Sequence, residues 1–203
     1  FGELREWVDK VVSAVGKVAF TVELKYDGLT VNVTYRDGKF VGAATRGNGV
    51  EGENITKQVK TIRSVPLTIP FKGECELQGE GIMRLSVLNR YNDKHAENPL
   101  KNARNAAAGA LRNLDPKVTA ERNLDVVFYS SGYEVGLQAN SQTELVDFLK
   151  SNGFATNYVF QTATTFEEIK EIILKIGELR PKLDFLIDGV VIKVNDYTIR
   201  EEL

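Results

Sequence analysis

Apolar residues recur with the spacing of an α-helix at the start of the chain. Between residues 3 and 15 an apolar residue returns every three or four positions, which places these side chains on one helical face. The helix at 165–179 has the clearest signals, because Thr165 and Glu168 form a capping box ahead of an isoleucine stripe. The same reasoning predicts further helices at 84–95, 102–113 and 141–151, and a short helical run at 55–62.

Apolar and polar residues alternate in three runs near the N-terminus, at 18–25, 29–36 and 39–45. Asp27-Gly28 and Asp37-Gly38 lie between these runs, and such pairs are strong hairpin signals, so the pattern predicts a three-stranded antiparallel meander. Helices and strands do not alternate regularly along the chain. The predicted fold class is therefore α+β, with antiparallel sheets flanked by helices. Further strands are predicted at 65–70, 74–83, 124–131 and 186–195.

Length and composition are those of a globular domain. The chain has 203 residues, 42% hydrophobic and 27% charged, so residues 1–203 are expected to form one domain with a sizeable core. The single Cys75 excludes an internal disulfide. Because no apolar run approaches about 18 residues and the first helix contains acidic residues, we expect no membrane span, no signal peptide and a cytoplasmic location.

Charge is unevenly distributed along the chain. The net charge of −2, from 26 Lys and Arg against 28 Asp and Glu, excludes a chain that is basic throughout. The segment 84–122 nevertheless contains eight Lys or Arg against four Asp or Glu. Such an excess is ordinarily a solvated helical face, and it indicates phosphate binding only if other features do so too.

Two lysines occupy strand positions with nearby carboxylates. The alternation of a strand places Glu23, Lys25 and Asp27 on one face, where the plain interpretation is an ion pair beside a hairpin and the functional one is a nucleophilic lysine. In Ile187–Val194, Lys193 follows Asp188 by five residues in an otherwise apolar strand. It is interpreted either as a charge that protects an edge strand or as an isolated cation facing a ligand.

Glycines and arginines accompany these lysines. Glu80 lies between two glycines in a strand, a pattern typical of a bulge or of close approach by a backbone or ligand. The glycine-rich run 46–54 begins with Arg46 and predicts either an anion cradle or a wide turn. Arg104 and Arg112 lie about 80° apart on the helix at 102–113, which is interpreted either as an alanine-rich core helix with solvated arginines or as a phosphate-binding face.

Taken together and in this order, K-x-D-G, G-E and I-D-G-V-V-I-K resemble the nucleotidyltransferase superfamily of DNA ligases and capping enzymes. Four segments are more specific and resemble bacterial NAD-dependent DNA ligases: ATRGNGVEGENIT, KTIRSVPL, ARNAAAGALRNLDPK and IDGVVIKVN. The resemblance extends from Phe1 to about Leu203. ATP-dependent ligases do not share ARNAAAG followed by LRNLDP.

The resemblance implies a mechanism. Lys25 would attack the α-phosphate of NAD, release nicotinamide mononucleotide and retain AMP, which then passes to the 5′-phosphate of a nick in double-stranded DNA and is displaced by the 3′-hydroxyl. Mg²⁺ would assist, without an assigned set of protein ligands. Lys193 would contact phosphate and, as a second cation, favour the neutral amine of Lys25.

The resemblance also implies roles for the other site residues. Asp27 and Asp188 would orient a lysine or help to place Mg²⁺. The remaining implied contacts are Glu23 with adenine, Glu80 with ribose, Arg46 with ribose or phosphate, Tyr129 stacked on adenine, and Arg104, Arg112 and Arg180 with nucleotide or DNA phosphates.

The sequence departs from the family pattern in places. Asn48 and Asn54 stand where acids are usual, Gln78 where Arg is common and Ala103 where Pro is common. The subdomain that binds nicotinamide mononucleotide and the last nucleotidyltransferase motif are expected outside residues 1–203, so we expect a monomeric fragment with weak or no activity alone. Two alternatives stay open: a non-catalytic module that binds adenine nucleotides, or another lysine nucleotidyltransferase of the ATP-dependent ligase or capping type.

Overall fold

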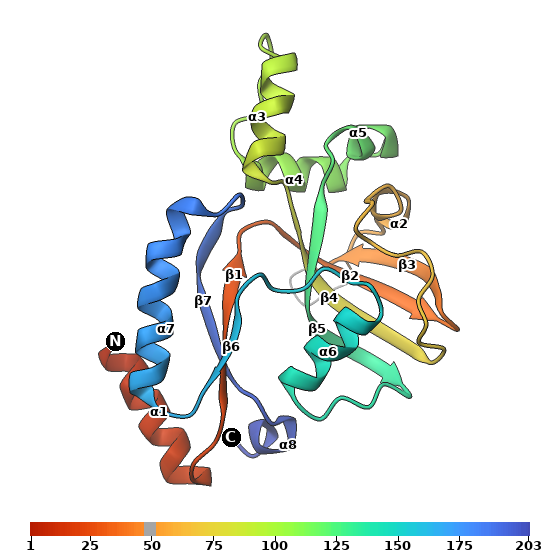
Figure 1. The fold of residues 1–203 in the computed structure, drawn as a ribbon. Coiled ribbons are helices and arrows are strands. Elements are labelled where there is room, and N and C mark those ends of the chain that lie inside the picture. The colour runs from red at the N-terminus through yellow and green to blue at the C-terminus, as the bar shows by residue number, and fades with distance from the viewer. Residues whose placement is uncertain (47–51) are drawn as a thin grey trace.

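The computed structural model describes residues 1–46 and 52–203, which form two antiparallel sheets with helices packed around them (Figure 1). The first sheet has the strand order β6-β1-β7, and the second has the order β3-β2-β4-β5. The predicted α+β class with antiparallel sheets is confirmed. The strands are β1 (Phe20–Tyr26), β2 (Leu29–Arg36), β3 (Lys39–Thr45), β4 (Glu74–Ile82), β5 (Asp125–Val135), β6 (Phe160–Ala163) and β7 (Ile187–Val194).

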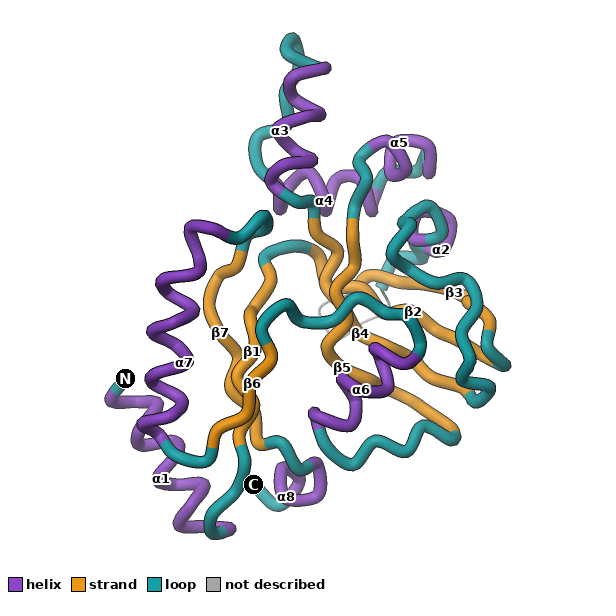
Figure 2. The backbone as a smooth tube through the Cα atoms, in the orientation of Figure 1, coloured by secondary structure: helices purple, strands orange, loops and turns teal. Residues whose placement is uncertain are grey.

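The helices surround the two sheets, as the tube view also shows (Figure 2). Helices α1 and α7 pack on the three-stranded sheet, α2, α4 and α6 pack on the four-stranded sheet, and α3 projects outward. No helix within residues 1–46 and 52–203 has the length and apolar character needed to cross a membrane. The helices are α1 (Gly2–Val15), α2 (Thr56–Val59), α3 (Leu85–Lys94), α4 (Ala103–Arg112), α5 (Pro116–Glu121), α6 (Gln142–Ser151), α7 (Phe166–Leu179) and α8 (Tyr197–Glu201), with a 3-10 turn at Arg180–Lys182.

The predicted three-stranded meander is wrong at its first turn. Strand β1 pairs with β6 and β7, whereas β2 pairs with β3 and β4, so Asp27-Gly28 carries the chain from one sheet to the other. Tertiary hydrogen bonds hold this crossing, because the N–H of Asp27 donates to Leu186 O and the N–H of Gly28 donates to Glu80. Asp37-Gly38 does form the predicted hairpin, with φ angles of 53° and 76°.

The predicted strand at 65–70 is also wrong. Pro66 and Pro70 have no N–H to donate, and only an isolated bridge between Thr68 and Lys39 forms there. The predicted helices at 84–95, 102–113, 141–151 and 165–179 are confirmed to within a few residues, while that at 55–62 shortens to α2. The pattern missed β6, α5 and α8, which are short and depend on tertiary contacts.

Each sheet has its own hydrophobic core. On the three-stranded sheet, Phe20 and Val22 of β1 pack with Ile169 and other α7 residues, and with Val8 of α1. The opposite face of β1 carries three polar side chains: Thr21 and Glu23, which are buried, and Lys25, which is exposed. A buried polar face on a strand needs polar partners. Glu23 finds its partners at the seam between the two sheets, where the candidate site lies, whereas the buried Thr21 hydroxyl has no hydrogen-bond partner among the described residues.

Candidate active site

A cavity of about 200 Å³ lies between the two sheets. The three-stranded sheet contributes both lysines singled out in the sequence, and the four-stranded sheet contributes a buried carboxylate and an aromatic ring. Five predicted site residues therefore line one cavity, although they come from four different strands. Its lining residues are Glu23, Leu24, Lys25, Tyr26, Thr30, Glu80, Tyr129, Asn157, Val191 and Lys193.

Lys25 lies near the end of β1 with its amine accessible. Its side chain is 59% exposed, and Asp188 Oδ2 lies 4.0 Å from its Nζ. The plain sequence interpretation, an ion pair with Glu23 or Asp27, is wrong, because those carboxylates contact Lys193 and Arg104 instead. A weakly held amine at the mouth of a cavity remains available to attack a bound ligand.

Glu23 is a buried charge with two partners. Its side chain is 2% exposed, Lys193 Nζ lies 3.0 Å from Oε2, and the Gln142 amide donates to Oε1 at 3.0 Å. Lys193 also lies 5.6 Å from the centre of the Tyr129 ring, within range of a cation–π contact. The interpretation of Lys193 as an isolated cation is therefore wrong. It compensates a carboxylate that would be costly to bury alone.

Glu80 is fixed by the crossing between the sheets. The Gly28 N–H donates to one carboxylate oxygen at 3.2 Å, and the Thr30 hydroxyl donates to the other at 2.9 Å. Burial raises the pKa of Glu80, and these two hydrogen bonds oppose part of that rise. The carboxylate is thus oriented toward the cavity by residues three and five positions after Lys25 in the chain.

Two glycines permit this close packing. A Cβ on Gly28 would lie 2.1 Å from Gly81 O, and a Cβ on Gly81 would lie 2.5 Å from Leu111 Cδ1 of α4. The glycine of K-x-D-G is therefore required by contact with backbone, whereas at Gly81 the obstacle is the flexible end of a leucine side chain. Both sequence interpretations of the G-E-G segment hold, because the register of β4 against β5 also shifts between Gln78 and Gly79, as at a β-bulge.

We expect Gly28→Ala to destabilise the fold by about 2 kcal/mol or more, because the added methyl group overlaps a backbone carbonyl. Urea denaturation followed by circular dichroism measures this change. Gly109→Ala is the matched control: a Cβ there meets nothing within 4 Å, and the helix should gain about 1 kcal/mol. Equal stability of the two variants would contradict the packing argument.

Tyr129 and Arg46 lie on the four-stranded side of the site. Burial and the nearby Glu80 carboxylate raise the pKa of Tyr129, while the Arg46 guanidinium acts in the opposite direction. The Arg46 side chain belongs to an exposed residue, and the backbone N–H of Arg46 donates to Thr30 O. Most of the glycine-rich run that begins at Arg46 lies outside the described residues.

The three other predicted arginines lie outside the lining of this cavity. Arg104 Nε lies 3.4 Å from Asp27 Oδ1, so α4 is tied to the loop that follows Lys25. Arg180 donates to Ile187 O at 2.7 Å and supports the start of β7, and Arg112 is exposed and does not line the cavity. Within the described part of the chain, no three His, Cys, Asp or Glu side chains gather as a metal site.

Sequence reasoning missed three polar residues of the site. Asn157 pairs its side-chain amide with the backbone N–H and C=O of Leu24, and Thr30 holds Glu80. Gln142 reaches Glu23 from the first residue of α6. Nothing in the local pattern distinguishes these residues, because their partners lie far away in the sequence.

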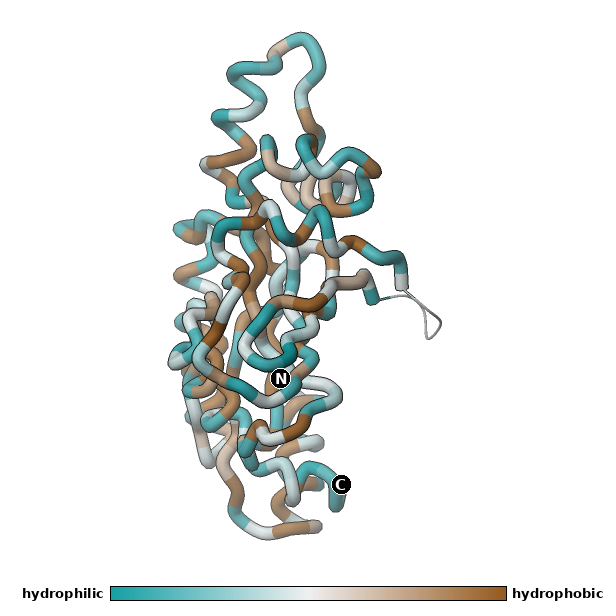
Figure 3. The backbone as a smooth tube through the Cα atoms, turned by 90° about the vertical axis from the view of Figure 1, so that its right-hand side faces the viewer, coloured by the Kyte–Doolittle hydropathy of each residue, from teal (hydrophilic) through white to brown (hydrophobic). Residues whose placement is uncertain are grey.

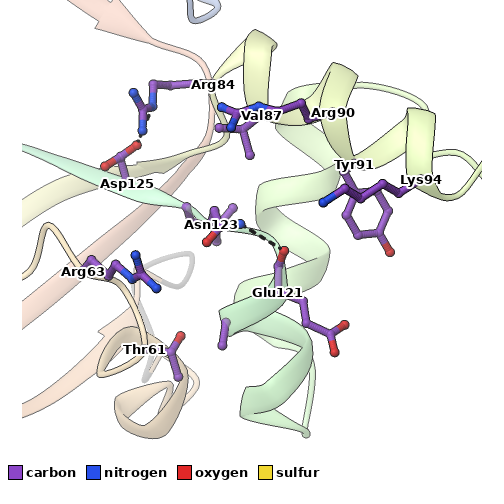
Figure 4. Close-up of a pocket in the computed structure, with 12 residues that line it drawn as sticks. Thr61, Arg63, Arg84, Val87, Arg90, Tyr91, Lys94, Glu121, Asn123 and Asp125 are labelled. Atoms are coloured by element: carbon purple, nitrogen blue, oxygen red, sulfur yellow. Dashed lines mark hydrogen bonds and ion pairs between the residues drawn. The ribbon is translucent and has the colours of Figure 1, made fainter.

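A second cavity, of about 620 Å³, lies beneath α3 (Figure 4). Arg90 and Lys94 project from α3, and Arg63 lies across the cavity from them. Arg84 forms an ion pair with Asp125 at 2.9 Å. The cavity is lined by four cationic side chains and two acidic ones, Asp125 and Glu121, so this cleft is positively charged. We refer to it as the cationic cleft.

Comparison with solved structures defines the class of fold. A structure named Pmar-Lig_Pre. matches with a TM-score of 0.55 at 14% identity, covering 91% of this chain and 41% of that one. This likeness concerns the fold alone.

The chain belongs to the family of NAD-dependent DNA ligase adenylation domains, whose family model matches residues 2–203. It is 53% identical over 212 residues to a DNA ligase of Finegoldia magna, covering 99% of this chain and 32% of that protein. A DNA ligase of Alkaliphilus metalliredigens is 48% identical, with 99% and 31% covered. The chain thus spans about a third of the length of the curated relatives that it matches.

Proposed function

We propose that this chain is the adenylation core of an NAD-dependent DNA ligase in which Lys25 is the nucleophile. The observation that supports this most directly is the accessible Lys25 amine at the mouth of a cavity that also contains Lys193, Glu80 and Tyr129. A bond forms between Lys25 Nζ and the α-phosphorus of NAD as the phosphorus–oxygen bond to nicotinamide mononucleotide breaks. Nζ loses a proton to solvent and retains AMP.

The cavity lining suits the adenosine half of NAD. Tyr129 offers an aromatic face for adenine, and Glu80 with Thr30 offers acceptors and a donor for ribose hydroxyls. Glu23 Oε2 is buried and, among the described residues, has Lys193 as its cationic partner and receives no hydrogen bond. A donor on the base can fill that position.

The charges around Lys25 suit a phosphate group. Lys193 and Arg46 supply cations for the α-phosphate. Asp27 follows Lys25 by two residues, and Asp188 Oδ2 lies 4.0 Å from Lys25 Nζ on the neighbouring strand. Both would help to hold Mg²⁺, which offsets phosphate charge when bound. Arg180 and Arg104 then act by holding β7 and the loop after Lys25.

The experiment that tests this function uses protein that contains the whole segment and compares two labelled donors. NAD labelled in its AMP half should transfer label to the protein, and ATP labelled in its α-phosphate should not. Peptide mapping should place the label on Lys25. Equal labelling from ATP would favour the capping or ATP-dependent type, and no label from either donor would favour a non-catalytic binding module.

We further propose nicked double-stranded DNA as the partner of the whole protein. The cationic cleft, together with Arg112 at the exposed end of α4, offers positive charge where a duplex backbone can lie. Hydrophilic residues predominate in the outer part of the projecting α3 (Figure 3), as expected for a surface that contacts a polyanion. A monomeric state and a cytoplasmic location complete the proposal.

Removing three cations of the cleft, Arg63→Ala with Arg90→Ala and Lys94→Ala, should weaken binding of nicked DNA. Each phosphate contact contributes about 0.9 to the slope of log affinity against log salt, so the slope should fall by about 2 to 3. Fluorescence anisotropy over a salt series measures this slope. Lys10→Ala with Lys175→Ala and Lys182→Ala removes the same charge elsewhere and should leave it unchanged; equal losses would point to net charge rather than to the cleft.

A further inference from the structure

Gln142 is a polar residue buried at the seam between the sheets. It is the first residue of α6 and is 1% exposed, a burial that is unusual for glutamine. Its Nε2 donates to Glu23 Oε1 at 3.0 Å and to Tyr129 O at 2.8 Å. Its Oε1 accepts from the Tyr197 hydroxyl at 2.8 Å. Both donors and the oxygen of this amide are therefore satisfied.

The two acceptors belong to different sheets. Glu23 lies on β1 of the three-stranded sheet, and Tyr129 lies on β5 of the four-stranded sheet (Figure 1). The cavity opens between these strands, with the Glu23 carboxylate on one side and the Tyr129 ring on the other. One amide group thus sets the spacing of the two walls at that point.

The position of Gln142 is itself held from two directions. Its N–H donates to Asn195 O at 2.9 Å, and the N–H of Tyr197 donates to Asn140 O at 2.9 Å, so the start of α6 is clamped to the chain that leaves β7. Burial raises the pKa of Tyr197 to about 12, so its hydroxyl stays protonated and can donate at neutral pH. The reverse amide orientation would set the Gln142 oxygen against two acceptors.

A glutamate needs such support to present one defined oxygen. Rotation about its terminal carboxylate bond is soft, so the orientation depends on its partners. Lys193 is a point charge that either oxygen satisfies, whereas the Gln142 amide engages one oxygen in a fixed direction. Without Gln142, the carboxylate is free to turn toward the lysine with both oxygens.

We propose that Gln142 is a positioning residue for adenine selectivity: it holds the Glu23 carboxylate at a fixed distance from the Tyr129 ring, so that the site accepts a 6-aminopurine and rejects a 6-oxopurine. This rests on the proposed function of the cavity as the adenosine site. An exocyclic amine donates to a carboxylate, while the carbonyl of hypoxanthine repels it, and the discrimination requires the carboxylate to stay in place.

The test compares NAD, which donates AMP, with nicotinamide hypoxanthine dinucleotide, which donates IMP, as substrates for nucleotide transfer to full-length protein. The parent protein should prefer NAD. In Gln142→Met, which keeps the length of the side chain and removes its donors and acceptor, kcat/KM for NAD should fall about tenfold or more, chiefly through KM, and the preference should fall by a similar factor. Gln138→Met, the same change at an exposed glutamine, should alter neither quantity.

Tyr197→Phe provides a milder variant if Gln142→Met does not fold. It leaves both Gln142 donors in place and removes the partner of Oε1, so the preference for NAD should fall about threefold. An unchanged preference, or an equal loss with both donors, would show that the network only supports the fold and would overturn the proposal. Absence of any adduct in the parent protein would instead overturn the proposed function itself.

Discussion

Lys25→Arg is expected to abolish the AMP adduct, with a loss of at least about 10³-fold in the rate of adenylation by NAD, because removal of an enzymatic nucleophile commonly costs this much or more. Arginine retains the positive charge but stays protonated, so it cannot supply a neutral amine. The Lys25 side chain is 59% exposed and has a 4.0 Å contact with Asp188, so the fold should be unaffected. Intact-protein mass spectrometry after incubation with NAD measures the adduct.

The control for this variant is Lys175→Arg on α7, an exposed lysine paired with Glu171 on the same helix. Its adenylation rate and thermal midpoint should both equal those of the parent protein. Persistent labelling of Lys25→Arg at another residue would contradict the assignment of the nucleophile. A lowered thermal midpoint would instead show that Lys25 contributes to stability, which its exposure argues against.

Lys193→Ala is expected to lose both stability and adenylation. The Glu23 side chain is 2% exposed, and the variant leaves its charge without a cation. Breaking a fully buried ion pair costs about 3–5 kcal/mol, and because the Lys193 side chain keeps 21% exposure we expect about 2–3 kcal/mol here. Urea denaturation measures this loss. Adenylation should also fall steeply, since a cation for the α-phosphate is removed.

A second substitution separates the two effects of Lys193. In Lys193→Ala with Glu23→Gln, the buried group is neutral, so most of the lost stability should return. Adenylation should remain low, because the phosphate still lacks its cation and the base lacks the Glu23 carboxylate; Glu23→Gln alone measures the second loss. Full stability of the single variant would refute the buried pair, and recovered adenylation in the double variant would refute a role for Lys193 at the phosphate.

The Glu23–Lys193 pair explains why the role of Lys193 could not be inferred from the sequence of its own strand. The apolar run around Lys193 indicates a strand but not the strand opposite. The register of β1 against β7, with Thr21 opposite Lys193 and Glu23 opposite Val191, brings the ammonium to the carboxylate. A shift by one residue would turn these side chains to opposite faces.

The sequence by itself determined the features that depend on neighbours in the chain or on the order of motifs. The helix α7 follows from its capping box and isoleucine spacing, and the β2–β3 turn follows from Asp37-Gly38, because both are local. The order of K-x-D-G, G-E and I-D-G-V-V-I-K indicated the superfamily, and longer segments such as ARNAAAGALRNLDPK indicated the family, which the comparison over residues 2–203 confirmed.

Only the tertiary structure decided how the site is assembled. The same Asp-Gly signal that makes a hairpin at Asp37 makes a crossing between sheets at Asp27, since Gly28 is drawn against Glu80 and the backbone of Gly81. Gln142 reaches Glu23 across 119 positions of sequence. Such contacts depend on strand register and on the packing of one sheet against another, and no local pattern of residues specifies either.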